Sequence, residues 1–256
     1  MNLNTILLLL TSIIIFTIGL FVYTRNKKSI ANRTFSALSL SLTIWLLGFS
    51  CMYSSKNANT ALIFARIGFL GIAFIPILSY HFISVFLNHK NPKFLLSIYI
   101  MTIILLPLSF TDYIYNGVKM RFFGYYPTAG KIYPIFLIAF IVLFLKGLYL
   151  LYTYYKKETK RNEQIKYVML GFFIGTFGVV DYLVKFQPFH NIYPFGYICA
   201  IGFYSIISYA IVKYHLMDIN IVIKKSTLFA YRVIFPVFKN FKIPDEFPLI
   251  RVLKLQ

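Results

Sequence analysis

Long apolar blocks constrain the fold of this chain more than any other feature of its sequence. Seven of them follow one another, approximately Leu3–Tyr23, Thr34–Met52, Ala61–Leu87, Phe94–Phe110, Tyr133–Tyr152, Tyr167–Val184 and Tyr193–Val212. Each is close to the roughly 20 residues that a helix needs to cross a hydrocarbon core of about 30 Å. The blocks are too uniformly apolar for barrel strands, which alternate in polarity. Because a backbone in lipid must satisfy its own hydrogen bonds, the sequence predicts an all-α, seven-helix transmembrane bundle.

The distribution of basic residues predicts how this bundle is oriented. The chain has 26 Lys and Arg residues against 7 Asp and Glu residues, a net charge of +19. In a soluble protein that charge would suggest a nucleic-acid partner. Here nineteen of the 26 lie in the connections on one side of the bundle and in the tail, and five lie on the other side. Since Lys and Arg collect on the cytoplasmic side of membranes, we expect an external N-terminus, a cytoplasmic C-terminus, contact with the lipid bilayer and no nucleic-acid partner.

Two charged residues inside the apolar blocks are candidate site residues. Arg66 lies about 8 Å in from the outer end of the third block at a rise of about 1.5 Å per residue, and Asp181 lies near the outer end of the sixth. A charge at membrane depth needs a partner or water. We therefore expect Arg66 and Asp181 to form an ion pair or to frame an outward-opening polar pocket. The alternative is that each side chain reaches the headgroups separately.

Aromatic and cofactor-type residues in the blocks favour packing over chemistry. His81 is the one histidine deep in a block, and a single axial ligand does not hold a transmembrane haem, so we expect a packed or hydrogen-bonded ring. Trp45 and Tyr80 could line a pocket, but packing is the stronger expectation. Cys51 and Cys199 form no metal-binding pattern. The sequence therefore predicts no cofactor, no metal site and no catalytic residue.

Two further stretches allow alternative interpretations. The connection Thr111–Ile132 is rich in Gly, Pro and Tyr, and it is either an interfacial aromatic belt or a cap over an outer pocket. Gly171 and Gly175 form a GxxxG pattern that permits close helix contact. We expect the surface formed by these glycines to contact another helix of the same bundle. The alternative is that it contacts a second copy of the chain in a dimer.

Five stretches in order carry a resemblance to a known family. They are Asn32–Tyr53, Phe64–Leu87, Gly124–Leu137, Arg161–Gly175 and Tyr193–Ile223, the last of which contains "YHLMDI". Together they resemble the seven-transmembrane N-terminal sensor region of bacterial and archaeal membrane histidine kinases. The resemblance implies a multi-pass sensor domain over residues 1–214 in a cell membrane. It also implies a small or lipid-soluble ligand, and a homodimer or a separate cytoplasmic signalling protein as partner.

The chain departs from whole kinases of that family after the last block. The sequence contexts of its histidines, His81-Phe, His89-Lys, His190-Asn and His215-Leu, lack the acidic residue of a phospho-accepting site, and 41 residues follow His215. We therefore expect no enzymatic activity, and a short cytoplasmic tail over residues 215–256, for which a position at the membrane interface is an alternative. The stretch around Lys213, His215 and Asp218 is the expected output connector.

Other functions fit the residues less well. A small transporter or channel is the alternative, but it usually shows internal repeats or broken helices around a polar centre, and only Pro76 and Pro107 suggest interruptions. A retinal sensor needs a lysine in the middle of the seventh block, where there is none. An intramembrane enzyme is disfavoured because HExxH, GxSxG and paired intramembrane aspartates are missing.

Overall fold

The computed structural model describes residues 3–157, 161–186, 189 and 192–214, with side chains placed through residue 211 in the last helix. Its elements are α1 (Leu3–Arg25), α2 (Ile30–Ser54), α3 (Ala58–Phe86), α4 (Pro92–Leu105), η1 (Pro107–Phe110), β1 (Tyr115–Arg121), β2 (Gly124–Ala129), α5 (Tyr133–Lys157), α6 (Asn162–Thr176), η2 (Phe177–Val179), α7 (Val180–Leu183) and α8 (Gly196–Tyr214).

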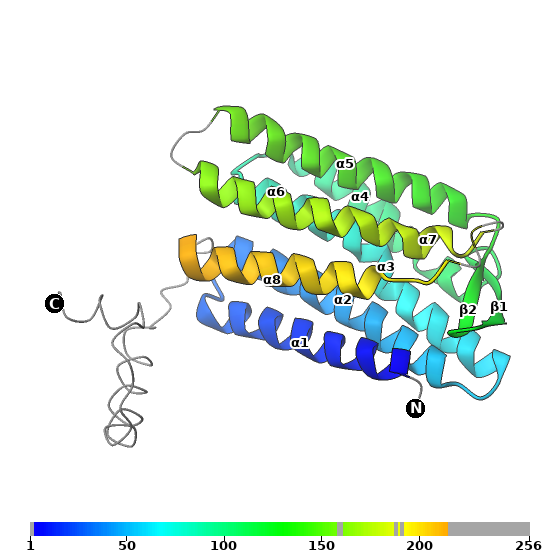
Figure 1. The fold of residues 1–256 in the computed structure, drawn as a ribbon. Helices are drawn as coiled ribbons and strands as arrows, with labels where there is room; N and C mark the ends of the chain where they lie inside the picture. The colour runs from blue at the N-terminus through cyan, green and yellow to red at the C-terminus, as the bar shows by residue number, and fades with distance from the viewer. Residues whose placement is uncertain (1–2, 158–160, 187–188, 190–191, 215–256) are drawn as a thin grey trace, which may run out of the picture. The chain divides into compact units, whose positions relative to one another are not determined.

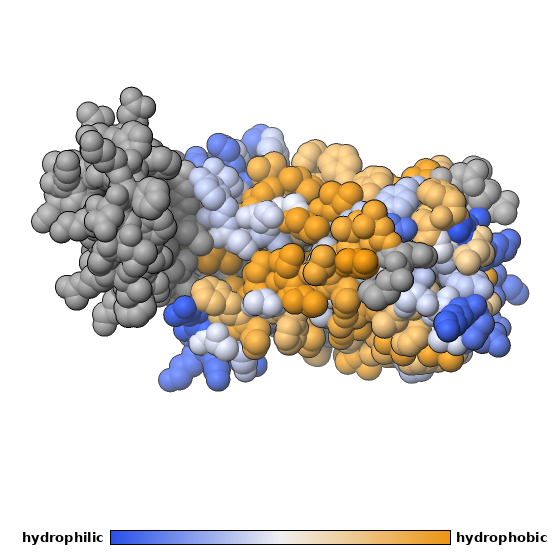
Figure 2. Space-filling model, turned by 60° about the horizontal axis from the view of Figure 1, so that its bottom comes forward, coloured by the Kyte–Doolittle hydropathy of each residue, from blue (hydrophilic) through white to orange (hydrophobic). Residues whose placement is uncertain are grey.

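The long helices lie side by side as a bundle, with a small hairpin at one end (Figure 1). We call this the hairpin end; α1 begins there, and α8 ends at the opposite, exit end. Within the described residues, six helical segments have the length and composition of membrane spans, with α4–η1 and α6–η2–α7 each counted as one. On the face that Figure 2 shows, hydrophobic side chains form a band over the middle of the helices, and hydrophilic side chains gather toward the two ends. The chain is therefore a multi-pass membrane protein.

Each of the seven predicted blocks contains helix, and α8 of the last block has 19 residues. Its apolar part within the described side chains runs over Gly196–Ile211. Local signals explain several boundaries. Ser29 caps α2 by accepting from the Asn32 amide, and Asn57 caps α3 by accepting from the Thr60 amide at 2.9 Å. Asn and Ser are preferred at these positions because their side-chain oxygens satisfy otherwise unpaired amides.

The prediction of an all-α fold is wrong for the connection between η1 and α5. Strands β1 and β2 pair antiparallel, with Arg121 opposite Gly124 and an irregularity between Tyr115 and Gly117. Gly124 has φ +123°, and a Cβ there would lie 3.0 Å from the Tyr53 ring. Glycine is suited to this position because it alone adopts such angles freely. The hairpin is thus pressed onto the end of α2 and covers this part of the bundle.

Close packing without bulky side chains joins α1, α2 and α3. A Cβ at Gly71 would lie 2.3 Å from the carbonyl oxygen of Ser41, and the Ser41 hydroxyl donates to the Gly71 carbonyl at 2.6 Å. Small residues and interhelical hydrogen bonds are the usual means of helix association in lipid. The same reasoning applies to Gly171, whose face meets Phe203 and Ile207 of α8. The GxxxG contact is therefore inside the bundle at Gly171, as expected.

Candidate functional site

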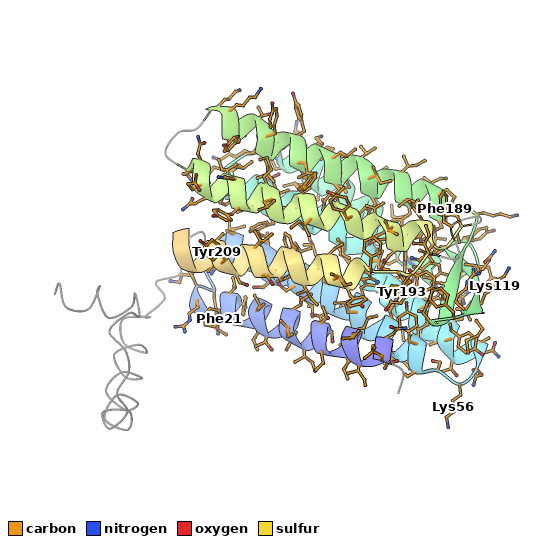
Figure 3. The ribbon with its side chains drawn as sticks, viewed as in Figure 1. Phe21, Lys56, Lys119, Phe189, Tyr193 and Tyr209 are labelled. Atoms are coloured by element: carbon orange, nitrogen blue, oxygen red, sulfur yellow. The ribbon has the colours of Figure 1, made fainter. Side chains whose placement is uncertain are left out.

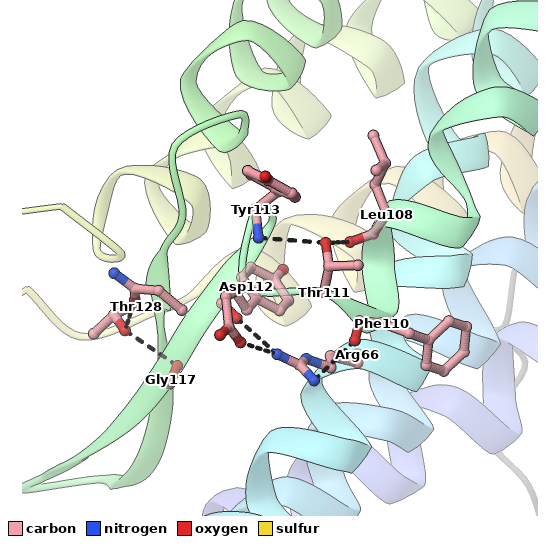
Figure 4. Close-up of polar contacts among 10 residues, drawn as sticks. Arg66, Leu108, Phe110, Thr111, Asp112, Tyr113, Gly117 and Thr128 are labelled. Carbon is pink, nitrogen blue, oxygen red and sulfur yellow. Dashed lines mark hydrogen bonds and ion pairs between the residues drawn. The ribbon is translucent and has the colours of Figure 1, made fainter.

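Arg66 fastens the start of the hairpin to α3 (Figure 4). Its Nη2 donates to the Asp112 carboxylate at 2.6 Å and to the Tyr115 carbonyl at 3.2 Å, and its Nη1 donates to the Phe110 carbonyl at 3.0 Å. The Asp112 side chain is 83% exposed. The expected ion pair with Asp181 is therefore not formed, because Arg66 points to the connection that follows η1.

Substitutions at the two ends of this ion pair are expected to have unequal effects. Asp112→Asn should lower the free energy of unfolding by at most about 1 kcal/mol, because exposed ion pairs contribute little. Arg66→Gln also removes two charge-assisted bonds to backbone carbonyls and should cost about 1.5–3 kcal/mol. Unfolding of the purified chain in detergent measures both. Equal losses would show that the bonds from Arg66 to the backbone carbonyls contribute nothing to stability. A double-mutant cycle in which Arg66 is coupled to Asp181 and not to Asp112 would support the pairing predicted from the sequence.

Asp181 holds the beginning of the last helix. It is 5% exposed, and its Oδ1 accepts from the Gly196 amide at 2.8 Å. Gly196 is the first residue of α8, where backbone amides have no partner inside the helix and where negative charge is favoured. A Cβ at Gly196 would lie 2.6 Å from Asp181 Oδ2, so a glycine lets the carboxylate approach this closely.

The backbone carbonyl of Asp181 joins two more elements at the same point. It accepts from Tyr126 of β2 at 2.7 Å and from the Lys185 Nζ at 2.7 Å. Burial raises the pKa of Tyr126 well above its ordinary value and the nearby Asp181 raises it further, so the hydroxyl stays protonated and donates. We call Asp181, Tyr126, Lys185 and Gly196 the Asp181 junction. It connects the hairpin, the end of α7 and the start of α8.

Lys185 is almost completely enclosed, with 4% exposure. Its Nζ lies 5.0–5.6 Å from the ring centroids of Tyr182, Tyr126, Tyr133 and Phe49, which we call the Lys185 cage. Aromatic faces within about 6 Å attract a cation. Burial lowers the pKa of Lys185, and the neighbouring Asp181 carboxylate opposes that shift. The rings and the carboxylate are therefore what allow an ammonium group to remain in this interior position.

A narrow apolar crevice lies between α8 and the helices that face it. Its volume is about 60 Å³, and Trp45, Phe144, Phe172, Cys199 and Phe203 are among the residues that line it. Gly196 and Tyr182 also line it, so the crevice reaches the Asp181 junction. Such a space can take the end of an alkyl chain, whereas a larger occupant must move α8 or its neighbours.

The remaining candidate residues, Trp45, Tyr80 and His81, do not form one site. Trp45 lines the crevice and packs edge-on against Phe49 with ring centroids 6.2 Å apart. Tyr80 is buried elsewhere, against Phe94 and below Lys146. His81 is hydrogen-bonded to the Tyr99 hydroxyl at 2.8 Å, which confirms the expected hydrogen-bonded ring.

The output connector lies mostly outside the described part of the chain. Lys213 is in the last turn of α8, and His215, Asp218 and the rest of residues 215–256 fall outside the described residues. In the described part, no group of three or more His, Cys, Asp and Glu side chains gathers as metal ligands would.

Sequence reasoning missed Lys185, Tyr126 and Gly196, which complete the junction around the predicted Asp181. A weak signal was present for Lys185, because it is a lysine directly after an apolar block.

Comparison with known proteins identifies the family of the whole helical bundle. The family model described as the N-terminal 7TM region of histidine kinase matches residues 7–220. No curated protein and no solved structure matches the chain. The match extends from α1 past the end of α8 and confirms the resemblance that the sequence patterns carry. Because it covers most of the chain, this protein belongs to the family of N-terminal 7TM regions of histidine kinases.

Proposed function

We propose that the chain is the signal-input module of a membrane sensor in the cell membrane of a bacterium or archaeon, with seven spans and the hairpin end outside. The family match over residues 7–220 is the observation that carries this proposal. The excess of Lys and Arg at the exit end supports the orientation. The 19 residues of α8 extend about 28 Å at 1.5 Å per residue, which supports a seventh span.

The signal in this proposal leaves through α8. The Gly196 amide at the start of the helix is hydrogen-bonded to Asp181, and the first part of the helix, from Gly196 to Phe203, borders the crevice. A ligand can shift an equilibrium only if it binds the two states unequally. A lipid-soluble molecule larger than the narrow crevice meets that condition, because it fits only where α8 has moved. The chain acts by binding and not by catalysis, and it passes the shift to a partner copy or a separate cytoplasmic signalling protein.

A fusion protein with a measurable output tests the proposal. The dimerisation and ATP-binding domains of a histidine kinase are joined after residue 219, and autophosphorylation is measured in proteoliposomes. Ala200 lines the crevice and is buried, so Ala200→Leu fills part of the space and should change the output several-fold. Ile201→Leu, on the exposed face of the same helix, is the matched control.

Two results would count against the proposal. The first is an output that Ala200→Leu and Ile201→Leu leave equally unchanged. The second is solute flux through proteoliposomes of the unfused chain, which would favour a transporter or channel.

A further inference from the structure

A second pocket lies at the hairpin end, outside the crevice. It has a volume of about 500 Å³ and opens between the hairpin and the residues that follow α7. Lys119 and Arg121 of β1 line it together with Lys185, and Asn116 and Thr128 add an amide and a hydroxyl. We call it the hairpin pocket. Its size lies within the range of about 300–1,000 Å³ that is usual for small-molecule sites.

The lining of the hairpin pocket is strongly cationic. No acidic residue is among the described residues that line it. The charge of Lys185 is opposed by the nearby Asp181, which leaves Lys119 and Arg121 as two uncompensated positive charges. Two such charges converging on a partly enclosed space attract an anion more strongly than isolated surface lysines do.

Arg121 has a buried side-chain nitrogen, Nε, without a hydrogen-bond partner among the described residues. Buried polar atoms are paired in the great majority of cases, so an unpaired guanidinium nitrogen at a pocket needs an explanation. A guanidinium presents its donors as a rigid fork that matches the oxygens of phosphate and carboxylate groups.

We propose that the hairpin pocket binds a phosphate monoester group, carried either by a soluble molecule or by a lipid headgroup. A phosphate monoester carries a charge of about −1.5 to −2 near neutral pH and offers three acceptor oxygens. It therefore matches two uncompensated cations and the additional amide donor of Asn116, whereas Thr128 already donates its hydroxyl within the hairpin. A single carboxylate would leave one of those charges unbalanced.

An occupied hairpin pocket has a direct route to the last helix, a step that rests on the proposed function. Lys185 both lines the pocket and donates to the Asp181 carbonyl, and the carboxylate of Asp181 holds the Gly196 amide. A phosphate near Lys185 competes with the cage and with Asp181 for its positive charge. Binding thus acts on the contact that fixes the start of α8.

The binding test uses the full chain in nanodiscs of phosphatidylcholine. Inorganic phosphate is titrated against chloride at constant ionic strength, and binding is followed by calorimetry. We expect saturable phosphate binding that Arg121→Gln weakens about tenfold, since a charge-assisted bidentate contact is lost. Lys119→Gln should weaken it less and serves if Arg121→Gln does not fold. The matched control is Lys56→Gln, which removes the same charge from an exposed site at the same end (Figure 3).

Nanodiscs that contain phosphatidic acid, whose headgroup is a phosphate monoester, distinguish the two sources of the phosphate. If a headgroup fills the pocket, inorganic phosphate no longer binds in these discs; if the ligand is soluble, binding persists. Either outcome supports the pocket. Absence of saturable binding in both kinds of disc overturns the proposal, and so does an equal loss in Arg121→Gln and Lys56→Gln.

The kinase fusion separates this proposal from the proposed function. Phosphate binding without any change in autophosphorylation supports the pocket and removes its link to α8. A fusion that responds to Ala200→Leu while the chain binds no phosphate removes the pocket and keeps the sensor.

Discussion

Replacing Asp181 with Ala is expected to lower the free energy of unfolding by about 3–5 kcal/mol, the usual cost of removing one partner from a buried pair of charges. The change leaves the Gly196 amide without its acceptor and leaves Lys185 inside the protein without a nearby opposite charge. Both losses fall on a residue that is 5% exposed, so water does not compensate for them. Thermal and denaturant unfolding of the purified chain in detergent measures the effect.

Two further variants separate the contributions of the hydrogen bond and of the charge to the stability lost in Asp181→Ala. Asp181→Asn keeps an oxygen for the Gly196 amide, since Asn and Asp are comparable helix caps, and removes only the charge. Asp112→Ala removes a carboxylate from the same end of the bundle at an exposed position. We expect Asp181→Ala to exceed Asp181→Asn, and both to exceed Asp112→Ala. If Asp112→Ala were as damaging as Asp181→Ala, the junction would have no special role in stability.

The helices were predictable because their signal is long and redundant. Lipid requires about 20 apolar residues for each span, and this requirement is visible in the sequence without any knowledge of contacts. The hairpin was not predictable for a local reason. Asn-Gly is the strongest short signal of a hairpin turn, yet Asn116 and Gly117 lie inside β1, beside its irregularity. The residues between the paired ends are Phe122 and Phe123, which are not typical of a turn.

The candidate site was predicted only in part because depth in the membrane does not fix a partner. Arg66 and Asp181 do approach the same end, but residues in the connections between helices reach the same depth and compete as partners. Asp112 lies in a connection and takes Arg66, while Asp181 meets the backbone of α8. The Lys185 cage combines rings from α2, β2, α5 and α7. No spacing in the sequence brings those four segments together.

Lys185→Ala is expected to cost about 3–5 kcal/mol as well, because it leaves the buried Asp181 carboxylate without its cation. It also leaves an empty space between the four rings of the cage. n-Propylammonium has the three carbons and the ammonium group that Lys has beyond Cβ. We therefore expect it to raise the unfolding temperature of Lys185→Ala, because a ligand that binds only the folded state stabilises it. The unsubstituted chain, whose cage is already filled, should show no such rise.

The rescue also decides which interaction holds the cation. 1-Propanol has the same carbon chain without the charge, so rescue by propanol would mean that filling space is sufficient and would contradict a role for the cation. The comparison with the double variant Lys185→Ala/Asp181→Asn goes further. If propylammonium still stabilises the double variant, the rings and the Asp181 carbonyl are enough to bind a cation at about 5 Å from aromatic faces. If the effect disappears, the carboxylate is the main attraction. In that case Lys185 and Asp181 act as one buried charge pair. Phosphate binding in the hairpin pocket would then have to separate this pair in order to affect the start of α8.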